Sequence, residues 1–122
     1  MTKRVLVAED EPNIVAALEF LLQSNGYEVQ LARNGEDALR MVESGHPDLV
    51  LLDVMMPQRS GYEVCKQIRE RSDLSHVKIV MLSAKGRDAE VSRGLALGAD
   101  LYVTKPFSTR ELIGKIKTLL GE

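Results

Sequence analysis

At residues 49–53 the chain reads Leu-Val-Leu-Leu-Asp, four branched apolar residues followed by an acid. An uninterrupted apolar run of this length is typical of a strand buried on both faces, as in the centre of a parallel sheet. Asp53 would then lie at the carboxyl end of that strand. In open parallel sheets, sites form at this edge. We therefore expect the functional site around Asp53.

Strand-like and helix-like segments alternate along the whole chain. Each apolar run is followed by a stretch with apolar residues at helical spacing. Strict alternation with short connections indicates parallel strands joined by right-handed crossovers. The sequence therefore predicts an α/β fold, a single doubly wound parallel sheet with helices on both faces. The expected strands are residues 5–8, 27–31, 49–53, 79–82 and 101–103.

Local signals mark several element boundaries. Pro12 suits the first turn of a helix, where its missing N–H would be unpaired anyway. Ser60 with Glu63, and Ser108 with Glu111, have the spacing of capping boxes and predict the starts of two further helices.

Two other segments have shorter patterns. Residues 27–31 alternate apolar and polar side chains, which predicts an edge strand with Leu31 on its apolar face. Val91 and Leu95 are four residues apart, which predicts a fourth helix that ends at Gly98.

Composition and charge narrow the class of protein. With 122 residues and 44% apolar side chains, the chain is long enough for one core and too short for two ordinary domains. Its net charge of −2 gives no overall basic field for direct nucleic-acid or membrane binding. No apolar run reaches the length of a membrane span, and Cys65 is a single cysteine without a disulfide partner. We expect a cytoplasmic protein.

Polar side chains follow four of the five predicted strands. They are Glu9 and Asp10 after the first, Asp53 on the third, Ser83 on the fourth and Lys105 after the fifth. If the first and third strands are neighbours, their acids face each other across a crevice. Three carboxylates and one ammonium leave a local charge of −2, which one divalent cation would cancel. Oxygen ligands favour Mg²⁺ over Zn²⁺.

These side chains suit phosphoryl transfer to a carboxylate, because aspartate can form an aspartyl phosphate. Two other classes share part of the pattern. A flavodoxin-like cofactor binder would have the same fold, but its first loop would need hydroxyls and amides where residues 9–11 are acidic. A Mg²⁺-dependent phosphohydrolase with an aspartate nucleophile usually has a second acid two residues on, where this chain has Met55.

The chain also contains six short motifs in order: Ala8-Glu9-Asp10-Glu11, Leu51-Leu52-Asp53-Val54-Met55-Met56-Pro57, Ser60-Gly61, Leu82-Ser83-Ala84, Gly98-Ala99-Asp100 and Lys105-Pro106-Phe107. Together they resemble the receiver domain of two-component response regulators, the family that includes the bacterial chemotaxis regulator. The resemblance runs from Lys3 to about Leu120. It implies a flavodoxin-like (βα)5 fold with strand order 2-1-3-4-5, and residues 1–122 as one receiver domain without an output domain.

The resemblance also implies roles for the acidic residues. Asp53 would be the phosphoacceptor and would take a phosphoryl group from a phosphohistidine. Glu9 and Asp10 would hold Mg²⁺ together with Asp53 and the backbone carbonyl of Met55. The domain would be a signalling domain that catalyses its own phosphorylation and slow autodephosphorylation, and not an enzyme with a free substrate.

The resemblance assigns the remaining site residues to binding and switching. Lys105 would pair with the phosphoryl oxygens, Ser83 would hydrogen-bond to one of them, and Lys105-Pro106 would be a cis peptide. Ser83 and Tyr102 would form the switch, with Tyr102 rotating from an exposed to a buried position. Tyr102 as a plain packing residue remains an equal alternative.

The implied partners are a sensor histidine kinase or phosphotransfer protein and an unidentified effector or output domain. The effector would bind the face made by the fourth helix, fifth strand and fifth helix. A phosphorylation-dependent homodimer through that face is a further expectation. Val91 and Leu101 stand where related dimers use charged residues, whereas Asp100 and Glu111 match.

Overall fold

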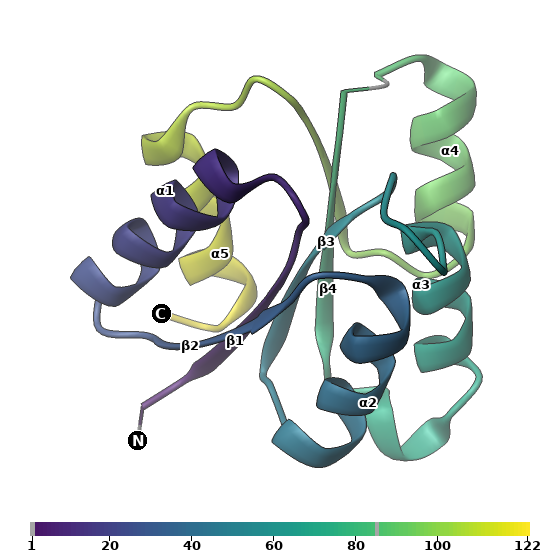
Figure 1. The fold of residues 1–122 in the computed structure, drawn as a ribbon, viewed down its shortest axis with the longest axis horizontal. Coiled ribbons are helices and arrows are strands. Elements are labelled where there is room, and N and C mark those ends of the chain that lie inside the picture. Colours follow the sequence, from purple (N-terminus) through teal and green to yellow (C-terminus); the bar gives the residue numbers. More distant parts are fainter. Residues whose placement is uncertain (1, 85) are drawn as a thin grey trace.

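The computed structural model describes residues 2–84 and 86–122. Strands and helices alternate as expected (Figure 1), with one short 3-10 turn, Ser72–Leu74, that the sequence patterns did not predict. The strands are β1 (Arg4–Ala8), β2 (Glu28–Ala32), β3 (Leu49–Asp53), β4 (Lys78–Ser83) and β5 (Leu101–Thr104). The helices are α1 (Pro12–Ser24), α2 (Gly35–Gly45), α3 (Gly61–Arg69), α4 (Asp88–Ala96) and α5 (Thr109–Leu119). Among the described residues, no helix is both long and apolar enough to cross a membrane.

The five strands form one sheet in the order β2-β1-β3-β4-β5, and every neighbouring pair is parallel. The predicted fold class and strand order are therefore confirmed. Helices α1 and α5 cover one face of the sheet, and α2, α3 and α4 cover the other (Figure 1). The strand order reverses between β1 and β3, so the carboxyl ends of these two strands flank the crevice where sites form in this fold class.

β3 is buried along its whole length, as its apolar sequence predicts. Leu49 and Leu51 pack into the layer of α1 and α5, whereas Val50 and Leu52 pack into the opposite layer. Burial of each leucine side chain contributes about 1.5–3 kcal/mol. A strand with apolar side chains on both faces is thus stable only between two helical layers. This places Asp53 at the carboxyl end of the central strand of the sheet.

Helix boundaries follow the predicted caps. The hydroxyls of Ser60 and Ser108 accept hydrogen bonds from the backbone N–H groups of Glu63 and Glu111, at 3.3 Å each. Helix α2 ends at Gly45, and the next residue, His46, adopts the left-handed conformation with φ of 50°.

Two leucines of the predicted patterns are exposed. Leu31 is 38% exposed, because it lies on the edge strand β2, where it lines a hollow with Pro12 and Val15 of α1. Leu95 is 46% exposed, because the residue of α4 that meets the sheet is the buried Gly94. A side chain at Gly94 would meet the ring of Tyr102, so the missing side chain lets the helix backbone lie against that ring.

Candidate functional site

Three acids from two strand ends converge as the sequence predicts. β1 and β3 are neighbours, with Ala8 opposite Leu52, so Glu9 and Asp53 follow at the same end of the sheet. One carboxylate oxygen from each of Glu9, Asp10 and Asp53 can be chosen so that all three lie within 4.8 Å of one another. Glu9 is fully buried and Asp53 is 3% exposed, whereas Asp10 is exposed. Two buried carboxylates and one solvated carboxylate therefore share this edge.

Lys105 supplies the positive charge of the site. Its Nζ lies 2.7 Å from Glu9 Oε1, 3.6 Å from Asp53 Oδ1 and 3.8 Å from the exposed Glu11. The contact with Glu9 is an ion pair and not an aligned hydrogen bond, because Glu9 Oε1 has no well-oriented donor among the described residues. The backbone of Lys105 is held by its N–H, which donates to the carbonyl of Ser83 at 2.8 Å. The Lys105-Pro106 peptide is cis, as the family resemblance implies.

The buried carboxylates have opposite pKa shifts. Burial, and after it the adjacent Glu9, raise the pKa of Asp53 to about 7 against the opposing effects of the Met55 N–H and Lys105. Burial also acts to raise the pKa of Glu9, but contacts with Asp53 and Lys105 outweigh it and hold that pKa below its ordinary value. The domain alone therefore carries more negative charge in this crevice than Lys105 can balance.

The donor set fits Mg²⁺. All three side chains offer carboxylate oxygens, which are hard ligands, and the exposure of Asp10 leaves room for the waters that Mg²⁺ retains. A divalent cation would also offset the charge that raises the pKa of Asp53. The backbone N–H of Met55 donates to Asp53 Oδ1 at 3.1 Å, and the Met55 side chain points to solvent with 59% exposure. The role of its carbonyl as a ligand stays a prediction.

The two predicted switch residues lie on neighbouring strands. Asp53 pairs with Leu82 in the β3–β4 register, so Ser83 follows at the same edge and is fully buried. Tyr102 lies on β5 and is half-buried, packed against the layer of α2, α3 and α4. Its movement and the phosphoryl contact of Ser83 stay predictions.

Gly61 belongs to one of the sequence motifs, which gave it no role in the site. A side chain there would lie 2.5 Å from the carbonyl oxygen of Asp53 and 2.8 Å from the Cα of Val54. Its N–H donates to the Val54 carbonyl at 2.9 Å. The loop after β3 can thus return closely against the end of the strand only with glycine at this position. A glycine directly after a helix cap is the signal that could have indicated such an approach.

Residues 5–117 match the family described as the response regulator receiver domain. The chain belongs to this family. The match covers most of the receiver domain described above, including every predicted site residue. Receiver domains of this family are signalling domains of two-component systems and imply an interaction with a histidine kinase or phosphotransfer protein.

Solved structures agree with this assignment. The receiver domain is similar to the signal receiver domain of a signal transduction histidine kinase from Syntrophus aciditrophicus, with 32% identity, a TM-score of 0.91, and coverage of 98% of this chain and 91% of that one. It is also similar to the chemotaxis protein CheY4 of Vibrio cholerae, with 29% identity, a TM-score of 0.90, and coverage of 98% and 99%. A BeF3-activated DrrB receiver domain has 34% identity, a TM-score of 0.89, and full coverage of both chains, 100% each.

Proposed function

We propose that this receiver domain accepts a phosphoryl group on Asp53 from the phosphohistidine of a sensor histidine kinase or phosphotransfer protein. The observation that carries the proposal is the buried Asp53 carboxylate with Glu9 and Asp10 within 4.8 Å and Lys105 Nζ at 3.6 Å. A strand-end acid with only a structural role would not need two further acids and a lysine around it. Such convergence of charged groups in one crevice is typical of a reactive site.

The transfer needs Asp53 in its ionised form. An Asp53 oxygen forms the bond to phosphorus while the bond from phosphorus to the histidine nitrogen breaks, and the imidazole leaves with the bonding electron pair. Bound Mg²⁺, held by Glu9, Asp10, Asp53 and the Met55 carbonyl, would offset the charge of the phosphoryl oxygens. Lys105, now paired with Glu9 and near Asp53, would then supply its ammonium to those oxygens.

Loss of the phosphoryl group would be slow self-hydrolysis. A hydrolase with an aspartate nucleophile uses a second acid two residues on to move a proton. Here that residue is Met55, whose thioether has no proton to give and whose side chain points away into solvent. The arrangement supports a stored signal more than rapid turnover of a substrate.

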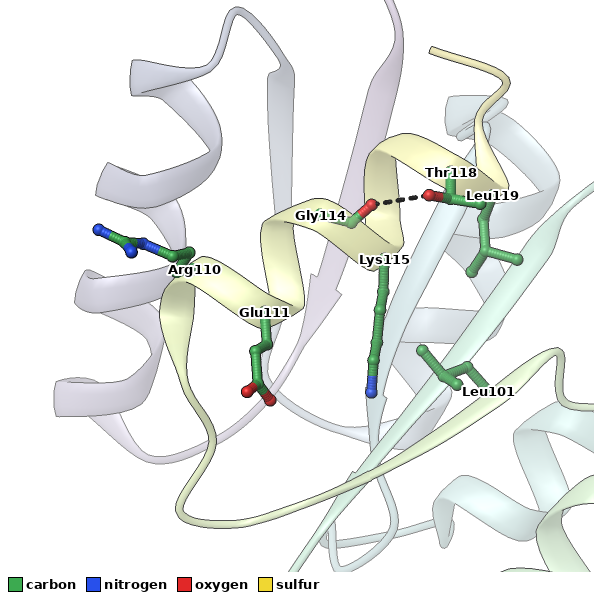
Figure 2. A pocket seen from close by; sticks show the side chains of 7 residues that line it. All are labelled: Leu101, Arg110, Glu111, Gly114, Lys115, Thr118 and Leu119. Carbon is green, nitrogen blue, oxygen red and sulfur yellow. Dashed lines mark hydrogen bonds between the residues drawn. The ribbon is translucent and has the colours of Figure 1, made fainter.

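The output of the switch would be the face made by α4, β5 and α5. A groove of about 380 Å³ lies on this face (Figure 2) and is lined by Leu101, Arg110, Glu111, Gly114, Lys115, Thr118 and Leu119. Figure 2 shows Glu111 and Lys115 projecting from α5 on the same side, toward β5, whereas Arg110 points away. Tyr102 adjoins this face through a second hollow that shares Glu111 and Lys115. A change at Tyr102 would therefore alter what an effector or output domain meets.

A homodimer through this face has less support. The Asp100 carboxylate, one of the residues expected to form dimer salt bridges, lies 2.9 Å from Arg69 and accepts the backbone N–H of Ile79 at 2.8 Å. These contacts within the domain would compete with any contact to a second copy. The proposal therefore assigns the face to a different downstream protein.

The test is intact mass after incubation with acetyl phosphate, with and without Mg²⁺, for the parent domain and Asp53→Ala. Asp73→Ala, at an exposed acid far along the chain, is the matched control. We expect one added phosphoryl group in the parent and in the control, none in Asp53→Ala, and none without Mg²⁺. Equal labelling of Asp53→Ala, or no labelling of the parent by this donor or by a panel of histidine kinases, would refute the proposal.

A further inference from the structure

Tyr62 connects three elements on the layer that carries Tyr102. It is the second residue of α3 and is only 7% exposed. Its hydroxyl donates a hydrogen bond to the backbone carbonyl of Glu90, in the first turn of α4, at 3.3 Å. The guanidinium of Arg93, one turn further along α4, lies 4.1 Å from the centre of the Tyr62 ring. A cation over an aromatic face at this distance is an attractive contact.

Burial, and after it the side chain of Tyr102 on β5, raise the pKa of the Tyr62 hydroxyl to about 12, so the two tyrosines are in contact. This contact favours the protonated form of Tyr62, whose hydroxyl lies 3.3 Å from the Glu90 carbonyl oxygen that it donates to. Tyr62 therefore contacts both the Tyr102 side chain and the start of α4.

Helix α4 also packs against the side chain of Tyr102. A Cβ atom on Gly94 would lie 2.9 Å from Tyr102 Cδ2 and 2.7 Å from Met81 Sδ. The helix backbone is thus in direct contact with the ring on one side, and Tyr62 contacts the same side chain. Both contacts act on the half-buried ring of Tyr102.

Tyr62 is also joined to the phosphoacceptor through the backbone. It directly follows Gly61, whose backbone packs against the Asp53 carbonyl so closely that a side chain would lie 2.5 Å away. The Gly61 N–H donates to the carbonyl of Val54, the residue after Asp53. A shift of the loop after β3 on phosphorylation would therefore move Gly61 and with it the Tyr62 ring.

We propose that Tyr62 is a positioning residue of the switch, which sets the resting place of Tyr102 and couples the loop after Asp53 to α4. This inference rests on the proposed function, because it describes how phosphorylation of Asp53 reaches the output face. The route runs through the start of α3 and is separate from the route through Ser83. It would act on two parts of the output face, which are the Tyr102 ring and the first turn of α4.

The variant Tyr62→Phe tests this, since it keeps the ring under Arg93 and removes only the hydroxyl. The matched control is Tyr27→Phe, because Tyr27 is 5% exposed and its hydroxyl donates to Glu122 in the opposite layer. Hydrogen exchange of residues 88–96 is measured with and without BeF3, alongside acetyl phosphate labelling. We expect amide exchange in α4 to be about fivefold faster in untreated Tyr62→Phe. We also expect a smaller BeF3-dependent change there, and parent-like exchange in Tyr27→Phe.

Two results would overturn the inference: unchanged exchange of α4 in Tyr62→Phe, or an equal increase in Tyr27→Phe. Labelling with acetyl phosphate separates this test from that of the proposed function. Loss of labelling in the parent domain contradicts phosphoryl transfer, whereas the exchange of untreated α4 still reports whether Tyr62 holds the helix. Retained labelling of Tyr62→Phe with a diminished BeF3 response is the result that assigns Tyr62 to coupling and not to the chemistry.

Discussion

Replacement of Asp53 by asparagine should stabilise the Mg²⁺-free domain at alkaline pH and leave it almost unchanged in acid. Burial and the adjacent Glu9 raise the pKa of Asp53 from 3.8 to about 7. Between these two values the native state binds a proton that the unfolded chain does not bind, so the free energy of unfolding falls as pH rises. The contribution of Asp53 to stability is thus fully present below its unfolded pKa and is lost as pH rises through about 7.

The size of the effect follows from the same shift. A rise of about three pKa units corresponds to about 4 kcal/mol between the protonated and ionised forms of the site. The lowered pKa of Glu9 contributes in the opposite sense, because its ionised form is favoured by Lys105 and by a protonated Asp53. Asparagine removes the ionisation while its amide oxygen can still accept the N–H of Met55. We therefore expect Asp53→Asn to gain about 2 kcal/mol at about pH 8 and close to zero at about pH 3.5, below the unfolded pKa of 3.8.

Urea unfolding in a chelator at the two pH values measures this difference. Asp73→Asn is the control, since Asp73 is exposed and pairs with Arg71 at the surface. Added Mg²⁺ should raise the unfolding midpoint of the parent at alkaline pH, and should raise that of Asp53→Asn much less, because a ligand that binds only the native state stabilises it. An equal stability change at both pH values, or a loss of stability at alkaline pH, would refute the reasoning.

Three further substitutions test Lys105 and two glycines within helices. Lys105→Met leaves Glu9 buried without its cation and should cost about 3 kcal/mol at alkaline pH, with slower acetyl phosphate labelling; unchanged labelling would show that the ammonium has no part in transfer. Gly114→Ala, where a Cβ has nothing within 4 Å, should stabilise α5 by up to about 1 kcal/mol. Gly94→Ala should instead destabilise the domain by about 1 kcal/mol, because the overpacking against Tyr102 outweighs the same helix gain; equal urea midpoints for the two variants would contradict this.

Most of the architecture could be predicted because its causes are local. The apolar run before Asp53 is stable only in a sheet that is covered by helices on both faces. Ser60 and Ser108 cap helices by accepting hydrogen bonds from backbone N–H groups three residues further on. The acids and the lysine were predicted to meet because the ends of parallel strands share one edge. The exposure of Leu31 and Leu95 could not be predicted, because short patterns do not show how far a helix covers an edge strand or which side of α4 meets the sheet.

The sequence by itself determined the order of elements, the strand-end position of Asp53 and the chemical type of its neighbours. Only the tertiary structure decided that Lys105 lies closer to Glu9 than to Asp53 and that Tyr102 is half-buried. It also decided that the side chain of Tyr62 on α3 contacts both α4 and β5. These contacts link residues far apart in the chain, so no local spacing encodes them. They arise because packing the helices onto the sheet brings the side chains together, and because a buried polar group must find its partner there.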